Sequence, residues 1–271
     1  MGTTKGNTQV AECIHGLDIP LCDICYPKAP PEKPRVSRPT RATAVPGVPR
    51  IASIRTSRTS INAGEQRIYH VTHIRNLEAI AAAGALTIDA TPTVDVSSEL
   101  TRELRISVPV TTATSPATEA ASSPSSVADY VPFYLAPDAV LWDELRTGAL
   151  DETRWSAAAR TATPFDFVFL VSTVAALGDG AVIADGDAAA TFTRFARADG
   201  IQRMIERLHD NEDARRTAEA LAPQSFPFAA VQLIGVANDR VRDQVRELLA
   251  DAVTAGPAPK VAVYPPWFQP A

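Results

Sequence analysis

Apolar positions divide the chain after residue 66 into short predicted strands and helices. Residues 67–71 are rich in Tyr, Ile and Val as strands are, and apolar residues from Asn76 to Gly84 recur at helical spacing. The segment FDFVFLVSTV, residues 165–174, is nearly all apolar, which predicts a central strand. Because the order of strands and helices is irregular, the pattern predicts an α+β fold. Further strands are expected at 130–137, 229–239 and 260–268, and helices at 101–106, within 188–221 and at 239–253.

Three segments of different composition follow one another along the chain. Residues 1–27 form a short unit with all the cysteines, residues 28–65 are rich in Pro, Arg, Ser and Thr, and residues 66–271 have the pattern of a folded domain. We interpret 28–65 as a flexible linker with a basic excess. It is either a basic arm that contacts phosphates or a solvated spacer, and the spacer is favoured. Residues 111–126 are of low complexity and predict a loop.

Composition restricts the class of protein. With 271 residues, 45% of them hydrophobic, the chain can bury a core of the size of one catalytic domain. There is no run of about eighteen apolar residues and no signal-peptide core, so we expect a cytoplasmic protein without a membrane segment. We also expect a monomer. The net charge of −5 argues against a surface that is basic all over, although it leaves room for a local basic groove.

A cluster of possible metal ligands lies near the N-terminus. Cys13, His15, Cys22 and Cys25 supply three thiolates and one imidazole, and Cys22 and Cys25 have the spacing of a zinc knuckle. The alternative is three reduced cysteines in a tail without a core. We favour a structural Zn²⁺, because a short segment would gain order from the metal.

Two histidines lie three residues apart at the end of the first predicted strand, in the sequence YHVTH. On a strand, His70 and His73 point to opposite faces and cannot bind one metal together, whereas His70 and Thr72 face the same side. A neutral histidine beside a threonine can bind a ribose hydroxyl or an amide. Taken alone, a histidine of the core or the surface is the more common explanation.

Two further stretches offer groups that could bind a ligand. Tyr130, Phe133 and Tyr134 in YVPFY can stack on a planar ring, although ordinary sheet core is the simpler explanation. Arg102 and Arg105 in the helical segment TRELRI can pair with a diphosphate, or they can lie on a solvated helix face.

Glu219 is surrounded by small apolar residues in the sequence TAEAL, where we expect the end of a helix. Such a carboxylate can be desolvated and catalytic, or it can pair with Arg215 or Arg216 on the same helix. The chain has no Gly-x-Gly-x-x-Gly, P-loop, Gly-x-Ser-x-Gly or His-Glu-x-x-His motif. This disfavours classical Rossmann dehydrogenases, NTPases, serine hydrolases and zinc peptidases.

Taken in order, the segments YHVTHIRNLEAIAAAGAL, YVPFYLAP, FVFLVSTV and RRTAEALAPQSFPFAAVQLIGV resemble the DarT family of DNA ADP-ribosyltransferases. The resemblance covers about residues 67–268, and the blocks YH-x-TH-x-x-NL and YVPFY are its specific part. It implies an ADP-ribosyltransferase fold, with a split central β-sheet around an NAD⁺-binding cleft. It also implies a toxin that modifies a base in single-stranded DNA and is paired with a macrodomain antitoxin.

The resemblance also implies roles for individual residues. His70 and Thr72 would hold the ribose and the nicotinamide amide of NAD⁺, and Glu219 would be the catalytic glutamate. The family uses one arginine between the first two blocks; we choose Arg102, with Arg105 close behind. The remaining pocket residues would be Leu77, Tyr130, Phe133 and Tyr134.

The implied reaction suits these residue types. Cleavage of the nicotinamide–ribose bond builds positive charge on the ribose, which a neighbouring carboxylate stabilises. The same carboxylate can take a proton from the attacking base. No metal is needed for this, so the zinc knuckle would lie outside the mechanism. Two alternatives stay open: the same fold modifying RNA or protein, and a catalytically idle module that binds NAD⁺ or nucleic acid.

Overall fold

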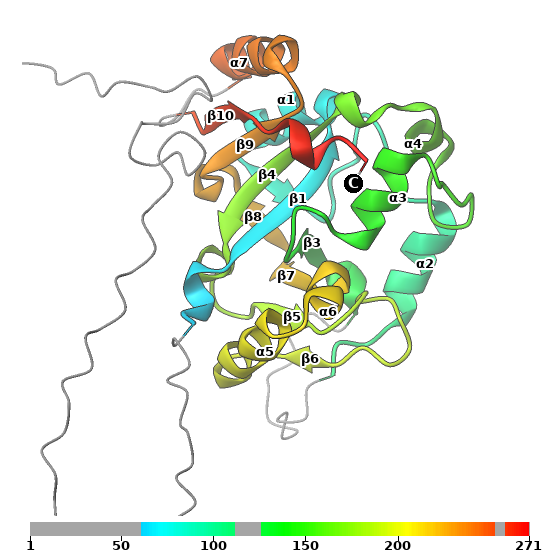
Figure 1. Cartoon of the computed structure of the whole chain (residues 1–271), viewed down its shortest axis with the longest axis vertical. Coiled ribbons are helices and arrows are strands. Elements are labelled where there is room, and N and C mark those ends of the chain that lie inside the picture. Colours follow the sequence, from blue (N-terminus) through cyan, green and yellow to red (C-terminus); the bar gives the residue numbers. More distant parts are fainter. Residues whose placement is uncertain (1–60, 112–125, 253–257, 271) are drawn as a thin grey trace, which may run out of the picture. The chain divides into compact units, whose positions relative to one another are not determined.

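The computed structural model describes residues 61–111, 126–252 and 258–270 of the chain (Figure 1). One compact unit extends over Asn62–Ala271 and contains every helix and strand described below. The predicted zinc ligands Cys13, His15, Cys22 and Cys25, nearly all of the predicted linker and most of the 111–126 loop lie outside the described residues.

A mixed sheet forms the centre of this unit, with the strand order β10-β9-β4-β1-β3-β7-β5-β6. The β9–β10 pair is parallel, and the other neighbouring strands are antiparallel. A second sheet pairs β2 with β8. The strands are β1 (Arg67–His73), β2 (Ala85–Thr87), β3 (Tyr130–Tyr134), β4 (Phe167–Thr173), β5 (Val182–Ala184), β6 (Phe195–Ala196), β7 (Glu219–Pro223), β8 (Ser225–Pro227), β9 (Leu233–Val236) and β10 (Lys260–Val263).

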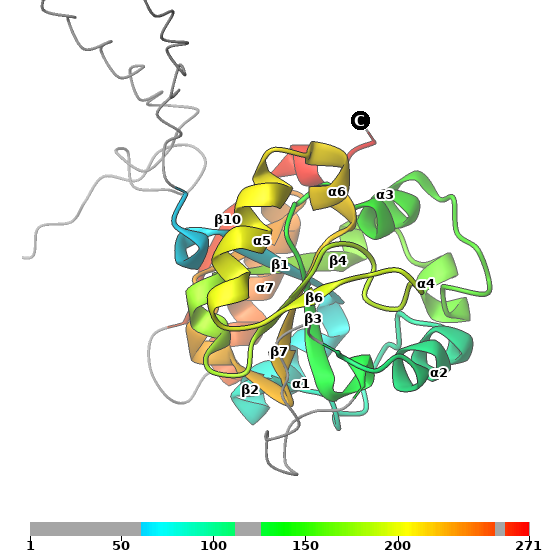
Figure 2. The ribbon, with the colours of Figure 1, turned by 90° about the horizontal axis from the view of Figure 1, so that it is seen from below.

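Seven α-helices and several 3₁₀ turns surround the sheet in the described part of the chain. α7 packs against α1 and β10 (Figure 1), and α5 packs against α6, β5 and β6 (Figure 2). The helices are α1 (Leu77–Ala83), α2 (Glu99–Ser107), α3 (Val140–Thr147), α4 (Ala157–Thr161), α5 (Asp199–His209), α6 (Glu212–Thr217) and α7 (Asp239–Ala252). The 3₁₀ turns are η2 (Ala63–Glu65), η3 (Ile74–Asn76), η4 (Val127–Asp129), η5 (Pro164–Asp166), η6 (Val174–Leu177), η7 (Phe228–Ala230) and η8 (Pro265–Trp267).

The α+β class is confirmed, and so is the buried strand at 165–174, where β4 is buried along almost its whole length. α1 ends where the sequence predicts, because Gly84 follows it in the left-handed conformation at φ 69°. Among the described residues no helix is long and apolar enough to cross a membrane.

The sheet is split between β1 and β3. β1 pairs with β4 along all of its length, from Arg67 to His73, but its register with β3 is the single pair Tyr69↔Tyr134. Pro132 in β3 has no N–H to donate across this gap. Its carbonyl accepts a hydrogen bond from the His70 ring at 2.8 Å instead of from a backbone group. The two strands therefore separate beyond Tyr69, which fits the predicted split sheet.

One predicted element is wrong. Residues 188–221 do contain α5 and α6, but the segment also contains β6 and the start of β7, and Glu219 begins a strand instead of ending a helix. Ala218, Ala220, Leu221 and Ala222 are all buried, since β7 lies between β3 and β5. A fully buried strand of small apolar residues lacks the alternation that marks a half-exposed strand, so its sequence looks helical.

Candidate active site

Glu219 lies at the start of β7, and only 1% of its surface is exposed. In the sheet it is the partner of Tyr134 in β3 and Ala184 in β5. Its Oε1 accepts a hydrogen bond from the backbone N–H of Ala188 at 2.9 Å, and its Oε2 accepts one from Arg105 Nη1 at 3.1 Å. Because a buried carboxylate is costly without partners, these two bonds allow the strand to present an acidic group to a cavity.

The two arginines of α2 have different surroundings. The Arg105 side chain is 16% exposed and pairs with Glu219, and its Nη2 is buried without a hydrogen-bond partner in the described part of the chain. The Arg102 side chain is 48% exposed and pairs with Asp95, and it also donates to the Ser97 carbonyl. The structure thus brings Arg105, and not the preferred Arg102, to the carboxylate.

The alternative that Glu219 pairs with an arginine of its own segment is wrong. Within the described residues, Arg105 is the cation that forms an ion pair with Glu219. Arg216 instead pairs with Asp138 and Asp143. α6 ends before Glu219, so the helical spacing on which that alternative depended does not exist.

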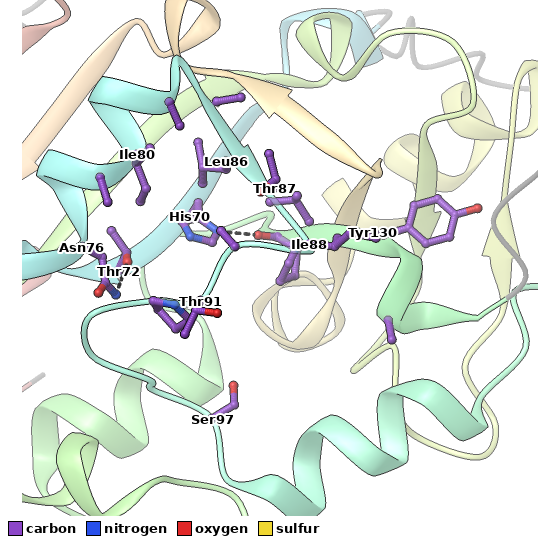
Figure 3. A pocket seen from close by; sticks show the side chains of 18 of the residues that line it. His70, Thr72, Asn76, Ile80, Leu86, Thr87, Ile88, Thr91, Ser97 and Tyr130 are labelled. Atoms are coloured by element: carbon purple, nitrogen blue, oxygen red, sulfur yellow. Dashed lines mark hydrogen bonds between the residues drawn. The ribbon is translucent and has the colours of Figure 1, made fainter. Parts of the chain in front are cut away.

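His70 and Thr72 reach the same cavities, as their spacing on a strand predicts (Figure 3). His70 Nδ1 lies 2.8 Å from the Pro132 carbonyl oxygen, which can only accept, so Nδ1 carries the proton and Nε2 is left as an acceptor. Burial lowers the pKa of His70 below its ordinary value, and the bond to Pro132 opposes this shift without cancelling it. His73 faces away: its ring packs against Phe167 and accepts from the Arg75 backbone N–H.

The walls of two adjoining cavities contain these groups. The larger, of about 470 Å³, has mainly apolar walls from α1, the segment after β2, and β3. The smaller, of about 250 Å³, contains Glu219 and Tyr134. His70, Thr72 and Arg105 line both cavities, so one elongated ligand can contact all three. The larger volume alone falls within the usual range for small-molecule sites.

The aromatic residues of β3 are distributed over different surroundings. Tyr130 lines the larger cavity, and its hydroxyl accepts a hydrogen bond from Arg197 Nη2 at 2.6 Å. Tyr134 lines the smaller cavity, and burial, followed by the nearby Glu219 carboxylate, raises the pKa of its hydroxyl above the ordinary value. Phe133 packs between the rings of His70 and Phe226.

Two predicted pocket residues belong to the core by their burial. Leu77 and Phe133 are at most 1% exposed, and neither is among the residues that line the two cavities. Leu77 is the first residue of α1, directly after a 3₁₀ turn, and its side chain is fully buried. Any effect of these two side chains on a ligand would act through the residues that they support.

Two features of the site were not found from the sequence. Asn76 is buried at the cavities and bonds to Thr72 and Val94. The loop between β5 and β6 supplies the Ala188 N–H to Glu219 and leaves Phe192 93% exposed. Asn76 belongs to the YH-x-TH-x-x-NL block, and this position could have marked it as a residue of the site. Nothing local in the sequence indicated that the β5–β6 loop contacts Glu219.

In the described part of the chain, no three His, Cys, Asp or Glu side chains lie together in a way that could hold a metal ion. The predicted zinc ligands are not among those residues. The zinc site therefore stays a prediction from the sequence.

Comparisons with known proteins agree on one family. Residues 69–269 match the family model described as "ssDNA thymidine ADP-ribosyltransferase, DarT". DNA ADP-ribosyl transferases from Mycobacterium bovis and Mycobacterium tuberculosis are each 30% identical over 205 residues, which cover 67% of this chain and 81% of theirs.

Solved structures show the same fold. Thermus sp. 2.9 DarT in complex with ADP-ribosylated ssDNA aligns with a TM-score of 0.62 at 23% identity, covering 75% of this chain and 96% of that one. The same DarT in complex with NAD⁺ gives a TM-score of 0.58. Thermosipho africanus DarTG in complex with ADP-ribose gives 0.53 at 18% identity, over 75% of this chain and 51% of that one. The chain belongs to the DarT family of ssDNA thymidine ADP-ribosyltransferases.

Proposed function

We propose that this protein transfers ADP-ribose from NAD⁺ to the thymine base of thymidine in single-stranded DNA, with Glu219 as the catalytic residue. The observation that carries the proposal is the buried carboxylate of Glu219, held by Ala188 and Arg105, in a cavity that also contains His70 and Thr72. Family membership supplies the donor, the acceptor base and the polymer.

NAD⁺ would lie across the two cavities. The bare Nε2 of neutral His70 is a hydrogen-bond acceptor for a ribose hydroxyl, and Thr72 offers a hydroxyl beside it. Arg105 can give its unpartnered Nη2 to a diphosphate oxygen. Arg102 lines the larger cavity and stays a second candidate for the same phosphates. Tyr134, in the cavity that contains Glu219, would contact the nicotinamide side, whereas Tyr130 lines the larger cavity four residues away along β3.

The reaction breaks the bond between the nicotinamide nitrogen and the ribose carbon, and the bonding electrons leave with nicotinamide. Positive charge grows on the ribose, where the Glu219 carboxylate would stabilise it. N3 of thymidine, the ring nitrogen that carries a proton, then bonds to the ribose carbon. Its proton passes to Glu219, which acts as a general base, and from there to water. The fixed position of Glu219 in the sheet supports this role, since a preorganised charge needs no rearrangement during the reaction.

The DNA strand would run past the β5–β6 loop. This loop holds Glu219 through Ala188 and exposes Phe192 and Arg194, whose side chain is 76% exposed. An exposed aromatic ring and a cation are the groups that bind single strands without a basic surface all over. A chain with a net charge of −5 can bind DNA in this way, because stacking replaces part of the electrostatic attraction to the phosphates.

The biological role in this proposal is that of a toxin acting in the cytoplasm on cellular DNA, restrained by a macrodomain antitoxin. The likeness to a DarTG chain, of which this protein covers 51%, is consistent with such a partner. The N-terminal Cys13, His15, Cys22 and Cys25 would bind a structural Zn²⁺, because three thiolates and an imidazole complete its tetrahedral coordination.

The test is to incubate the purified protein with NAD⁺ labelled in the adenylate and, separately, with single-stranded DNA, RNA and cell protein. Label is expected on DNA oligonucleotides that contain thymidine and not on matched oligonucleotides in which every thymidine is replaced by deoxycytidine. Label on RNA or protein alone would mean that this polymer, and not DNA, is the substrate. If no polymer is labelled although the protein binds NAD⁺, the protein is a binding module without transferase activity.

A further inference from the structure

The side-chain amide of Asn76 forms three hydrogen bonds within the protein. Nδ2 donates to Thr72 Oγ1 at 3.2 Å and to the Val94 carbonyl oxygen at 2.9 Å, and Oδ1 accepts from the Val94 N–H at 2.7 Å. The two bonds to Val94 fix which end of the amide is nitrogen, since a backbone N–H must meet oxygen and a carbonyl must meet N–H. Asn76 is only 5% exposed, so water does not compete freely for these bonds.

The orientation of this amide determines what Thr72 can do. An amide nitrogen cannot accept, so Thr72 Oγ1 is the acceptor in its bond with Asn76, and the hydroxyl hydrogen stays available. Among the described hydrogen bonds Thr72 donates none from this hydroxyl. Both cavities adjoin Thr72, so the hydrogen can be given to a ligand there.

Asn76 also fixes the segment that crosses the cavities. Residues 90–93 line the larger cavity, and Val94, next in the chain, lines the smaller one. The two hydrogen bonds between Asn76 and Val94 hold this segment against the turn before α1. Ser156 Oγ donates to the carbonyl oxygen of the neighbouring Asp95 at 2.6 Å. Asn76, which lies beside Thr72 in Figure 3, thus anchors both the Thr72 hydroxyl and this segment.

We infer that Asn76 is a positioning residue for cofactor binding: it makes Thr72 a hydrogen-bond donor to an acceptor oxygen of NAD⁺. His70 presents an acceptor at Nε2, so the strand end offers one acceptor and one donor two residues apart. This inference rests on the proposed function only in taking NAD⁺ as the ligand.

The decisive experiment is a double-mutant cycle on NAD⁺ affinity, measured by calorimetry without DNA. Asn76→Asp keeps the shape and the acceptor for Val94 N–H but loses both N–H donors, the one to Thr72 and the one to the Val94 carbonyl oxygen, so the Thr72 hydroxyl turns to the new carboxylate. Thr72→Val removes the hydroxyl. Each change should weaken NAD⁺ binding about tenfold, the free-energy value of roughly one hydrogen bond. Because both remove the Thr72 donor, their effects should not multiply, and the double variant should be weakened far less than about 100-fold.

A matched control separates positioning from general support of the segment. Ser156→Ala removes the neighbouring anchor without touching Thr72, so its effect on affinity should multiply with that of Thr72→Val. Thr72→Ser should bind NAD⁺ nearly as the natural protein does, since it keeps the hydroxyl. If Asn76→Asp does not fold, Asn76→Ala takes its place: it leaves the Thr72 hydroxyl unfixed, so its effect on affinity should be smaller in the Thr72→Val background than alone.

Two results would overturn the inference: NAD⁺ affinity in Asn76→Asp within about twofold of the natural protein, or effects of Asn76→Asp and Thr72→Val that multiply. Failure of the proposed function looks different. A natural protein that binds NAD⁺ but labels no DNA removes the DNA substrate and leaves this inference standing. A natural protein that does not bind NAD⁺ overturns both.

Discussion

The two walls of the cleft are built in different ways. On the sheet side, Glu219 and Thr72 are buried, and Glu219, His70 and Thr72 are each held by hydrogen bonds within the unit. On the other side lies α2, a helix with no buried residue, whose Leu100 and Leu104 are nearly half exposed. Figures 1 and 2 both place α2 at the edge of the unit.

Polar contacts hold α2 at its first turn. Ser98 Oγ donates to the Thr153 carbonyl, and Thr101 Oγ1 donates to the Arg154 carbonyl at 3.0 Å. With few buried apolar contacts, such an element opens at a lower free-energy cost than a core strand. The comparison indicates a fixed wall that carries Glu219 and an adjustable wall that carries Arg102 and Arg105, the arginines that the proposed function assigns to the phosphates.

The largest effect is expected from the fixed wall. Glu219→Gln keeps the size of the side chain and its bond from Ala188 but removes the charge, so DNA labelling should fall by about 10³-fold or more. NAD⁺ affinity, measured by calorimetry, should change far less. Labelling above a tenth of the natural rate would contradict the role of Glu219.

The adjustable wall is tested by comparing its two arginines. Arg105→Lys keeps the charge but loses the forked donor, so kcat/KM for NAD⁺ should fall about 100-fold, whereas Arg102→Lys should cost less than about fivefold. The physical reason is the position of Arg105 against Glu219, in contrast to the exposed pairing of Arg102 with Asp95. The reverse order of effects would restore Arg102 as the essential arginine.

A smaller effect is expected from pH. Burial lowers the pKa of both His70 and His73 below 6.5, their ordinary value, so the unfolded chain takes up these protons first. The stability they contribute is present above pH 6.5 and is lost as the pH falls through 6.5 toward the lower folded pKa. Protonation of His70 in the folded protein also removes the Nε2 acceptor, so NAD⁺ affinity should fall only at the acid end of this range, near the lowered pKa of folded His70.

The two histidines give matched variants for this test. The melting temperature of both His70→Asn and His73→Asn should depend less on pH between about 7.5 and 5.5 than that of the natural protein. The pH dependence of NAD⁺ affinity should be flattened in His70→Asn alone, since His73 packs against Phe167 away from the cavities. Flattening in His73→Asn would show that the cleft extends to that face.

The same comparison explains which parts of the site the sequence could predict. His70 and Thr72 followed from the two-residue period of a strand, a local rule. Glu219 was identified through the family resemblance, although its element was misassigned. Arg102 and Arg105 are three residues apart on one helix, and local spacing cannot tell which of them meets a residue 114 positions away.

The residues that hold the fixed wall in place could not be predicted from local sequence patterns either. Ala188 and Val94 reach Glu219 and Asn76 through backbone groups, which every residue type possesses. No side-chain pattern therefore indicates such a contact. The path of the folded chain between its helices and strands decides it.

The smallest effect is expected outside both walls, because every group of the cleft belongs to the unit that begins at Asn62. If residues 1–27 bind Zn²⁺ as their Cys and His spacing predicts, Cys22→Ser should release about one zinc ion per chain, as measured by mass spectrometry, and change DNA labelling less than about twofold. Asp23→Ser, beside a ligand but not one itself, is the matched control and should retain the metal. Natural protein without zinc would refute the knuckle. Loss of labelling in Cys22→Ser alone would mean that the metal segment takes part in binding the DNA, and the contrast between the two walls would then no longer describe the whole substrate site.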